Sequence, residues 1–162
     1  MRLYLTFALL AACTTGSIET EPGDDDPPGN EPPGNEPPGN EPRTVDIEGP
    51  AVLPHVQAFA NAACTALDSC TISTYEGHSP TASRALDNLV SDVYGKVPTD
   101  DNALGDALAA WALEHQEEFA ITYVIWRQRY NDGRGWDPME DRGSITQNHY
   151  DHVHVSFEAE GP

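Results

Sequence analysis

Residues 148–157 read Asn-His-Tyr-Asp-His-Val-His-Val-Ser-Phe and contain three of the six histidines in the chain. From His152 to Phe157 the stretch alternates polar and apolar residues strictly, which predicts a β-strand. Side chains two apart lie on the same face of a strand, so His152 and His154 are expected to point one way. The intervening valines are then expected to point into a core. The stretch therefore predicts a strand with polar chemistry on one face and packing on the other.

Outside this stretch, the spacing of apolar residues predicts the remaining elements of the fold. Apolar residues recur at helical spacing over 52–67 and again over about 100–119. The run Ile-Thr-Tyr-Val-Ile-Trp at 121–126 predicts a central strand, and shorter strands are predicted at 72–75 and 85–90. This order predicts an α+β fold, in which two helices pack on a small, mainly antiparallel sheet.

The charge balance of the chain excludes some classes of partner. The 162 residues include 27 Asp and Glu against 8 Lys and Arg, which gives a net charge of −19. Nucleic-acid binding needs clustered Lys and Arg to neutralise phosphates, so no nucleic-acid partner is expected. The same acidity argues against electrostatic docking on anionic lipid.

The N-terminus is typical of an exported protein. Arg2 precedes an apolar stretch, 3–12, that is too short to span a bilayer as a helix and is typical of a signal peptide. It ends in Leu-Ala-Ala-Cys, which resembles the cleavage box of bacterial lipoproteins, in which the cysteine is lipidated. We therefore predict a signal peptide over 1–12 and a lipid anchor on Cys13, which would hold the exported protein on the periplasmic or cell-surface side of a bacterial membrane. The alternative is an ordinary secretory peptide with an incidental cysteine.

A tether is predicted over residues 13–50. Three copies of Pro-Pro-Gly-Asn-Glu begin at Pro27, Pro32 and Pro37, and almost no apolar residue interrupts them. Such a sequence cannot bury a core, and its Pro pairs favour extended chain. A single domain, expected to be a monomer, is therefore predicted over 51–162.

Two cysteines remain in this domain, Cys64 and Cys70. In an exported protein this pair favours a local disulfide, which requires the first helix to end between them. Metal ligation and free buried thiols are the alternatives, although a two-cysteine zinc site would favour closer spacing.

A second polar motif lies upstream, where Gly77-His78-Ser79-Pro80 is followed by Ser83-Arg84-Ala85-Leu86-Asp87. Together with the His-x-His of 152–154, it resembles the superfamily of lysostaphin-type enzymes, D-alanyl-D-alanine carboxypeptidases and the Hedgehog signalling domain. In that superfamily a His, a short spacer and an Asp supply two zinc ligands, and a late His supplies the third. The chain departs from the pattern because the step from His78 to Asp87 is nine residues rather than seven, and the glycine between them is missing.

The resemblance implies a Hedgehog/DD-peptidase-like fold and a set of site residues. It makes His78, Asp87 and His154 the ligands of Zn²⁺, with the fourth position left for water. It gives His149 the role of the base that takes the water's proton. His152 would orient the water or stabilise the developing oxyanion.

Two further polar residues have open interpretations. Asp151 could orient one of the imidazoles, or it could be a solvated turn residue. Arg127 and Arg129 lie two apart and are expected to share a strand face, where they could bind a substrate carboxylate or pair with the many acids.

The resemblance and the predicted export together indicate a zinc metallopeptidase. The expected activity is zinc-dependent hydrolysis of a peptide bond in bacterial cell-wall peptidoglycan, by an endo- or carboxypeptidase that contacts the membrane only through its lipid anchor. The alternative is a catalytically inactive, zinc-containing binding module on the same tether, as in the Hedgehog domain.

Overall fold

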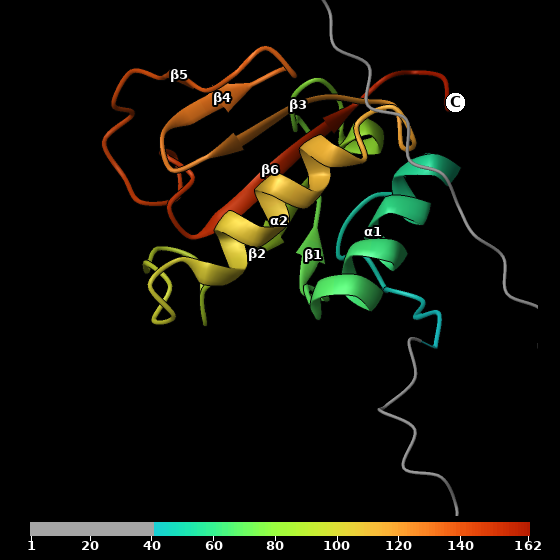
Figure 1. Cartoon of the computed structure of the whole chain (residues 1–162), viewed down its shortest axis with the longest axis horizontal. Helices are drawn as coiled ribbons and strands as arrows, with labels where there is room; N and C mark the ends of the chain where they lie inside the picture. Colours follow the sequence, from blue (N-terminus) through green and yellow to red (C-terminus); the bar gives the residue numbers. More distant parts are fainter. Residues whose placement is uncertain (1–40) are drawn as a thin grey trace, which may run out of the picture. The chain divides into compact units, whose positions relative to one another are not determined.

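The computed structural model describes residues 41–162 (Figure 1). The predicted signal peptide, the lipidation site Cys13 and the tether up to residue 40 lie outside the described residues. Within residues 41–162, neither helix has the length and apolar character needed to span a bilayer.

The sheet has six strands, and every pairing between neighbouring strands is antiparallel. Their order across the sheet is β1-β2-β6-β3-β4-β5. The strands are β1 (Ile72–Ser73), β2 (Ala85–Leu89), β3 (Ile121–Trp126), β4 (Arg129–Asn131), β5 (Asp137–Pro138) and β6 (His152–Phe157). The strand predicted from the alternating stretch is thus β6, and it lies between β2 and β3, inside the sheet.

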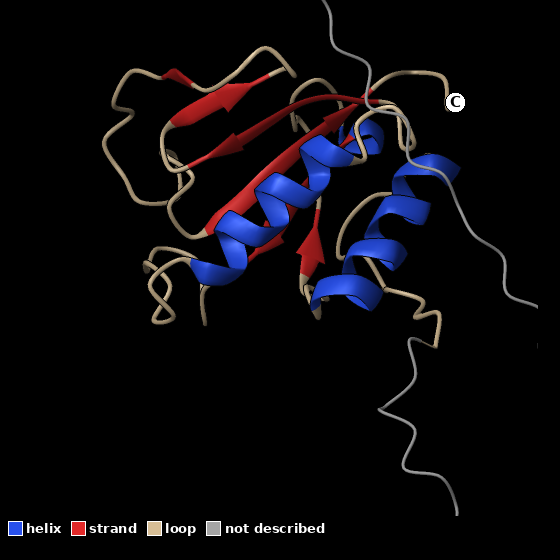
Figure 2. Cartoon of the chain, in the orientation of Figure 1, coloured by secondary structure: helices blue, strands red, loops and turns tan. Residues whose placement is uncertain are grey.

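Two helices, α1 (Pro54–Leu67) and α2 (Ala103–Glu114), lie against one face of the sheet (Figure 2). The α+β prediction is confirmed. The second helix is shorter than the predicted 100–119, because Asn102 at its start has positive φ and His115 at its end departs from helical geometry, with φ of −101° and ψ of 21°.

The hydrophobic core lies between the helices and the sheet. Val153, Val155 and Phe157 of β6 are fully buried, as the alternation predicts. Trp126 of β3 belongs to the same core, and it lies so close to Gly105 of α2 that a Cβ at Gly105 would be 2.1 Å from the indole ring. Because this face of the sheet is filled, the histidines of β6 must face the opposite side.

The packed part of the chain begins before residue 51. Val45 is buried, and its backbone N–H donates a hydrogen bond of 2.9 Å to Asn61 Oδ1. Glu48 forms a parallel bridge with Ser73 at the edge of the sheet. These contacts extend the domain into the last residues of the predicted tether, because the segment adds backbone hydrogen bonds to an otherwise open strand edge.

The cysteine prediction is confirmed, since Cys64 and Cys70 form a disulfide. Helix α1 ends at Leu67, and Asp68 adopts a left-handed conformation with φ of 59°. The chain reverses there, which brings the two cysteines together. A disulfide of this kind is consistent with export.

Candidate metal centre

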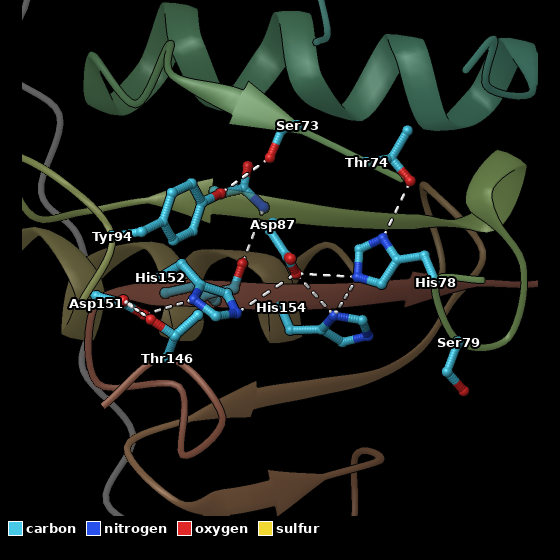
Figure 3. A network of polar contacts seen from close by, with 12 residues as sticks. Ser73, Thr74, His78, Ser79, Asp87, Tyr94, Thr146, Asp151, His152 and His154 are labelled. Atoms are coloured by element: carbon cyan, nitrogen blue, oxygen red, sulfur yellow. Dashed lines mark hydrogen bonds and ion pairs between the residues drawn. The ribbon is translucent and has the colours of Figure 1, made fainter. Parts of the chain in front are cut away.

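Three side chains converge on the sheet face that the helices leave free (Figure 3). Asp87 on β2 and His154 on β6 are register partners, so both project from the same face. His78 reaches them from the loop before β2. Its Nε2 lies 3.0 Å from Asp87 Oδ1 and 3.0 Å from His154 Nδ1, and the third distance, His154 Nδ1 to Asp87 Oδ1, is 2.9 Å. The predicted ligand residues therefore form a compact triangle of donor atoms, which we call the ligand group.

The size of this triangle fits a tetrahedral metal. Zinc bonds of about 2.0–2.1 Å at tetrahedral angles separate neighbouring ligand atoms by about 3.3 Å. The three edges of the ligand group are 2.9–3.0 Å, so an ion could be admitted by movements of a few tenths of an ångström. All three residues are buried, which limits such movements to small ones.

The hydrogen bonds of His78 indicate that the nitrogen facing the triangle is unprotonated and presents a lone pair. Its Nδ1 lies 3.0 Å from the hydroxyl of Thr74, and that hydroxyl donates its own proton to the carbonyl of Ala82 at 2.8 Å. The Thr74 oxygen must therefore accept a proton from His78 Nδ1. In the neutral imidazole, Nε2 then has no proton and is free to bind a metal.

The hydrogen bonds of His154 follow the same pattern, with the roles of Nδ1 and Nε2 exchanged. Its Nε2 lies 2.9 Å from the hydroxyl of Ser156, and this hydroxyl donates to the carbonyl of Ser79 at 3.3 Å. His154 Nε2 is therefore the protonated nitrogen, and Nδ1 presents its lone pair to the triangle. Hydroxyl partners of this kind fix the orientation and tautomer of metal-binding imidazoles.

Three hydrogen-bond acceptors thus meet at one buried point, and such a point requires a positive charge. Burial raises the pKa of Asp87, but the adjacent His154 and His78 outweigh burial and hold the pKa well below its usual range. A proton on one imidazole or a cation can supply the charge. Two neutral imidazoles and one carboxylate are a donor set typical of zinc. The residues present therefore fit a divalent metal ion, even though the His78–Asp87 spacing is longer than the pattern expects.

Asp151 and His152 form a second buried pair beside the ligand group (Figure 3). Asp151 Oδ1 accepts a hydrogen bond of 2.6 Å from His152 Nδ1, while its other oxygen accepts hydrogen bonds from Gly95 N and Thr146 Oγ1. Asp151 is therefore a buried orienting residue and not a solvated turn residue. With Nδ1 protonated, His152 directs the lone pair of Nε2 towards Asp87 Oδ1, which is 3.5 Å away.

His149 lies on the same side of the domain because the chain turns at this residue. Its φ is 55°, and its ring centroid lies 4.7 Å from that of His152 and 5.6 Å from that of His154. Its Nδ1 is buried without a hydrogen-bond partner among the described residues. Burial lowers the pKa of His149 to about 3, with smaller contributions from the neighbouring His152 and His154 and from Arg142, against an opposing effect of Asp87. His149 is therefore a neutral imidazole beside the ligand group.

The ligand group lies in a cleft of about 980 Å³. Three tyrosines contribute to its walls, and each contacts a site histidine: the Tyr75 ring stacks on His78 at 4.3 Å, the Tyr94 ring meets His152 edge-on at 5.6 Å, and the Tyr123 ring stacks on His154 at 5.8 Å. Such a cleft is wide enough for a short peptide or a comparable ligand.

The prediction that Arg127 and Arg129 share a strand face is wrong. Arg127 and Gln128 form the tight turn between β3 and β4 and both have positive φ, so Arg127 and Arg129 do not share a strand face. Arg127 lines a smaller pocket of about 370 Å³ beside Asp106 and is not part of the cleft wall. The two-residue turn contains no glycine, so it lacks the motif from which such turns are predicted.

The residues that orient the site were not among those predicted from the sequence. Thr74 and Ser156 position the two ligand imidazoles, and Thr146 holds Asp151. Ser156 could have been found, because it lies two residues after His154 on the same face of β6. The contacts of Thr74 and Thr146 depend on how the loops fold, which no local pattern predicts.

Fold and site together define an α+β domain with a buried His-His-Asp group that could hold a metal ion. The chain matches the family model described as VldE, C-terminal domain, over residues 48–150, which is more than half of its length. The chain belongs to this family. The matched range includes His78, Asp87 and His149 and ends just before β6.

One curated relative shares part of the chain. It is described as an uncharacterized secreted protein of Arthroderma benhamiae and is 41% identical over 59 residues, which cover 32% of this chain and 24% of the relative. The chain thus spans about a quarter of that protein. No solved structure matches the chain. Neither the family description nor the relative's name mentions a peptidase, so the resemblance to the lysostaphin and Hedgehog superfamily stays a prediction.

Proposed function

We propose that the domain is a zinc-dependent hydrolase that cuts a peptide bond, with a peptide of bacterial peptidoglycan as its substrate. The observation that carries the proposal is the convergence of three unprotonated ligand atoms, from His78, Asp87 and His154, in a cleft that also holds two further histidines. A site that served only to hold a metal would not need neutral imidazoles beside the ligand group.

When bound, zinc would polarise the scissile carbonyl and lower the pKa of a water molecule. The proton transfers would depend on residues of the chain. His152 has an unprotonated Nε2 directed at the site and a buried carboxylate behind it, so it can accept a proton while Asp151 stabilises the resulting positive charge. His149 is neutral and has no hydrogen-bonded carboxylate among the described residues. Once protonated, His152 can return this proton to the leaving amine.

Two residues of the site, His149 and His152, are candidates for the predicted base role. His149 lies at the site as the resemblance implies, and the Asp151 contact makes His152 the better proton acceptor. A carboxylate bonded to one imidazole nitrogen makes the other nitrogen more basic, and His149 has no such partner among the described residues. We therefore propose that His152 takes the proton from water and returns it to the leaving amine, while the ring N–H of neutral His149 donates a hydrogen bond to the leaving nitrogen.

The test separates metal binding from hydrolysis. Zinc-loaded protein is incubated with purified muropeptides, and the products are separated by mass, with and without a chelator. His149→Asn suits the test because asparagine tolerates the positive φ at this position. We expect this variant to retain zinc and to lose about 10²–10⁴-fold in hydrolysis. Half-buried His115, which contacts Trp111 on α2 and lies outside the cleft, provides a matched control in His115→Asn. Zinc-loaded protein that cuts no muropeptide would refute the proposal.

A further inference from the structure

The cleft is lined by both acidic and basic side chains. Glu48 and Glu76 line it on the β1 side, close to His78. Arg142 lines it from the loop before β6, close to His149. It is the one Lys or Arg among the residues that line this cleft. A peptide that crosses the ligand group would therefore meet both acidic groups and a guanidinium.

The backbone of Arg142 is fixed, while its side chain is free. Its N–H donates to Asn148 Oδ1 at 2.8 Å, and Asn148 Nδ2 donates to Asp141 Oδ1 at 2.6 Å. The nearby carboxylate of Asp141 also accepts from Gly143 N at 2.8 Å. Within residues 41–162, no carboxylate pairs with the Arg142 guanidinium, whereas Arg43, Arg127 and Arg134 each have an acidic partner.

An arginine held beside His149, with no acidic partner of its own among the described residues, is suited to a carboxylate ligand. A guanidinium binds a carboxylate through two parallel hydrogen bonds. In a C-terminal amino acid a single carbon separates the amide nitrogen from the carboxylate. A carboxylate on Arg142 would therefore bring the leaving nitrogen of the last peptide bond towards His149.

We propose that Arg142 binds the free C-terminal carboxylate of the peptide, so that the site removes the last residue of a chain. The inference rests on the proposed hydrolysis and decides between carboxypeptidase and endopeptidase. In the reaction one water is consumed, the C–N bond breaks, the carbonyl carbon gains the water oxygen, and one water proton ends on the leaving amine. Glu48 and Glu76 then face the other part of the peptide, where an ammonium group would be favoured.

The test compares stem peptides that have a free C-terminus with the same peptides as C-terminal amides. Binding to the zinc-loaded His149→Asn protein is measured by calorimetry, and hydrolysis is measured with the unmodified protein. We expect the acid to be favoured over the amide by about 10- to 100-fold in both measurements. Arg142→Gln should reduce the preference to within about threefold without changing zinc content, and Arg142→Lys should keep part of it. Arg134→Gln is the matched control, because Arg134 is exposed, pairs with Asp132 and lies outside the cleft.

The outcomes distinguish this inference from the proposed function. Equal hydrolysis of acid and amide would overturn the role of Arg142 and leave the hydrolase intact. An Arg142-dependent preference in binding without any hydrolysis would refute the hydrolase and support carboxylate recognition. A protein that neither binds nor cuts the peptides would refute both.

Discussion

Ser156 should control metal affinity although it does not touch the metal. In the unmodified protein, Ser156 accepts the Nε2 proton of His154 and so keeps Nδ1 unprotonated. In Ser156→Ala that acceptor is lost, and the metal-free imidazole can move its proton to Nδ1, where Asp87 accepts it at 2.9 Å. Metal binding must then reverse this change, at a cost of about one hydrogen bond to a charged group, 1.5–3 kcal/mol.

A cost of this size corresponds to a loss of about 10- to 100-fold in zinc affinity, which is the range observed for residues that orient metal ligands. The assay is competition for zinc with a chromophoric chelator at pH 7.5. Ser83→Ala is the matched control, because Ser83 contacts only Thr81 through its hydroxyl. An unchanged zinc affinity in Ser156→Ala would refute the argument that hydroxyl partners set the tautomers of the site.

Two further predictions concern stability. Because the pKa of His149 is lowered to about 3 in the folded protein, against about 6.5 in the unfolded chain, unfolded chains bind more protons between these values. Chelator-treated protein should therefore lose stability as pH falls from 6.5 towards 3, by up to about 1.4 kcal/mol per pH unit from this residue. In urea unfolding, the free energy of unfolding of His149→Asn should fall less steeply with pH than that of the unmodified protein. Equal pH slopes for the two proteins would contradict a lowered pKa at His149. Replacing both Cys64 and Cys70 by Ser opens a short loop and should cost about 2 kcal/mol in the same assay, whereas an unchanged unfolding midpoint would show that the bridge adds no stability.

Much of the fold could be predicted because its central elements have strong periodicity. The alternation in β6 predicted both its bounds and the face on which His152 and His154 lie, and the β-branched and aromatic run at 121–126 predicted β3. The ends of α2 were predicted less well, since they depend on the positive φ of Asn102 and on the non-helical backbone of His115, which helical propensity does not reveal.

The site was predictable where it depends on strands and unpredictable where it depends on loops. Asp87 and His154 face each other because β2 and β6 are neighbours in register. Arg142 was not recognised, because its place at the cleft results from hydrogen bonds between Asp141 and Asn148 within a long loop.

The central claim is that His78, Asp87 and His154 bind one divalent metal ion. The direct measurement is the metal content of purified residues 14–162 by mass spectrometry, after incubation with a small excess of zinc and dialysis against metal-free buffer. We expect about one zinc per chain in the unmodified protein and none in Asp87→Ala or His154→Ala, with the folded state of each variant checked by circular dichroism. Folded, unmodified protein without bound metal, or variants that keep their zinc, would contradict the account.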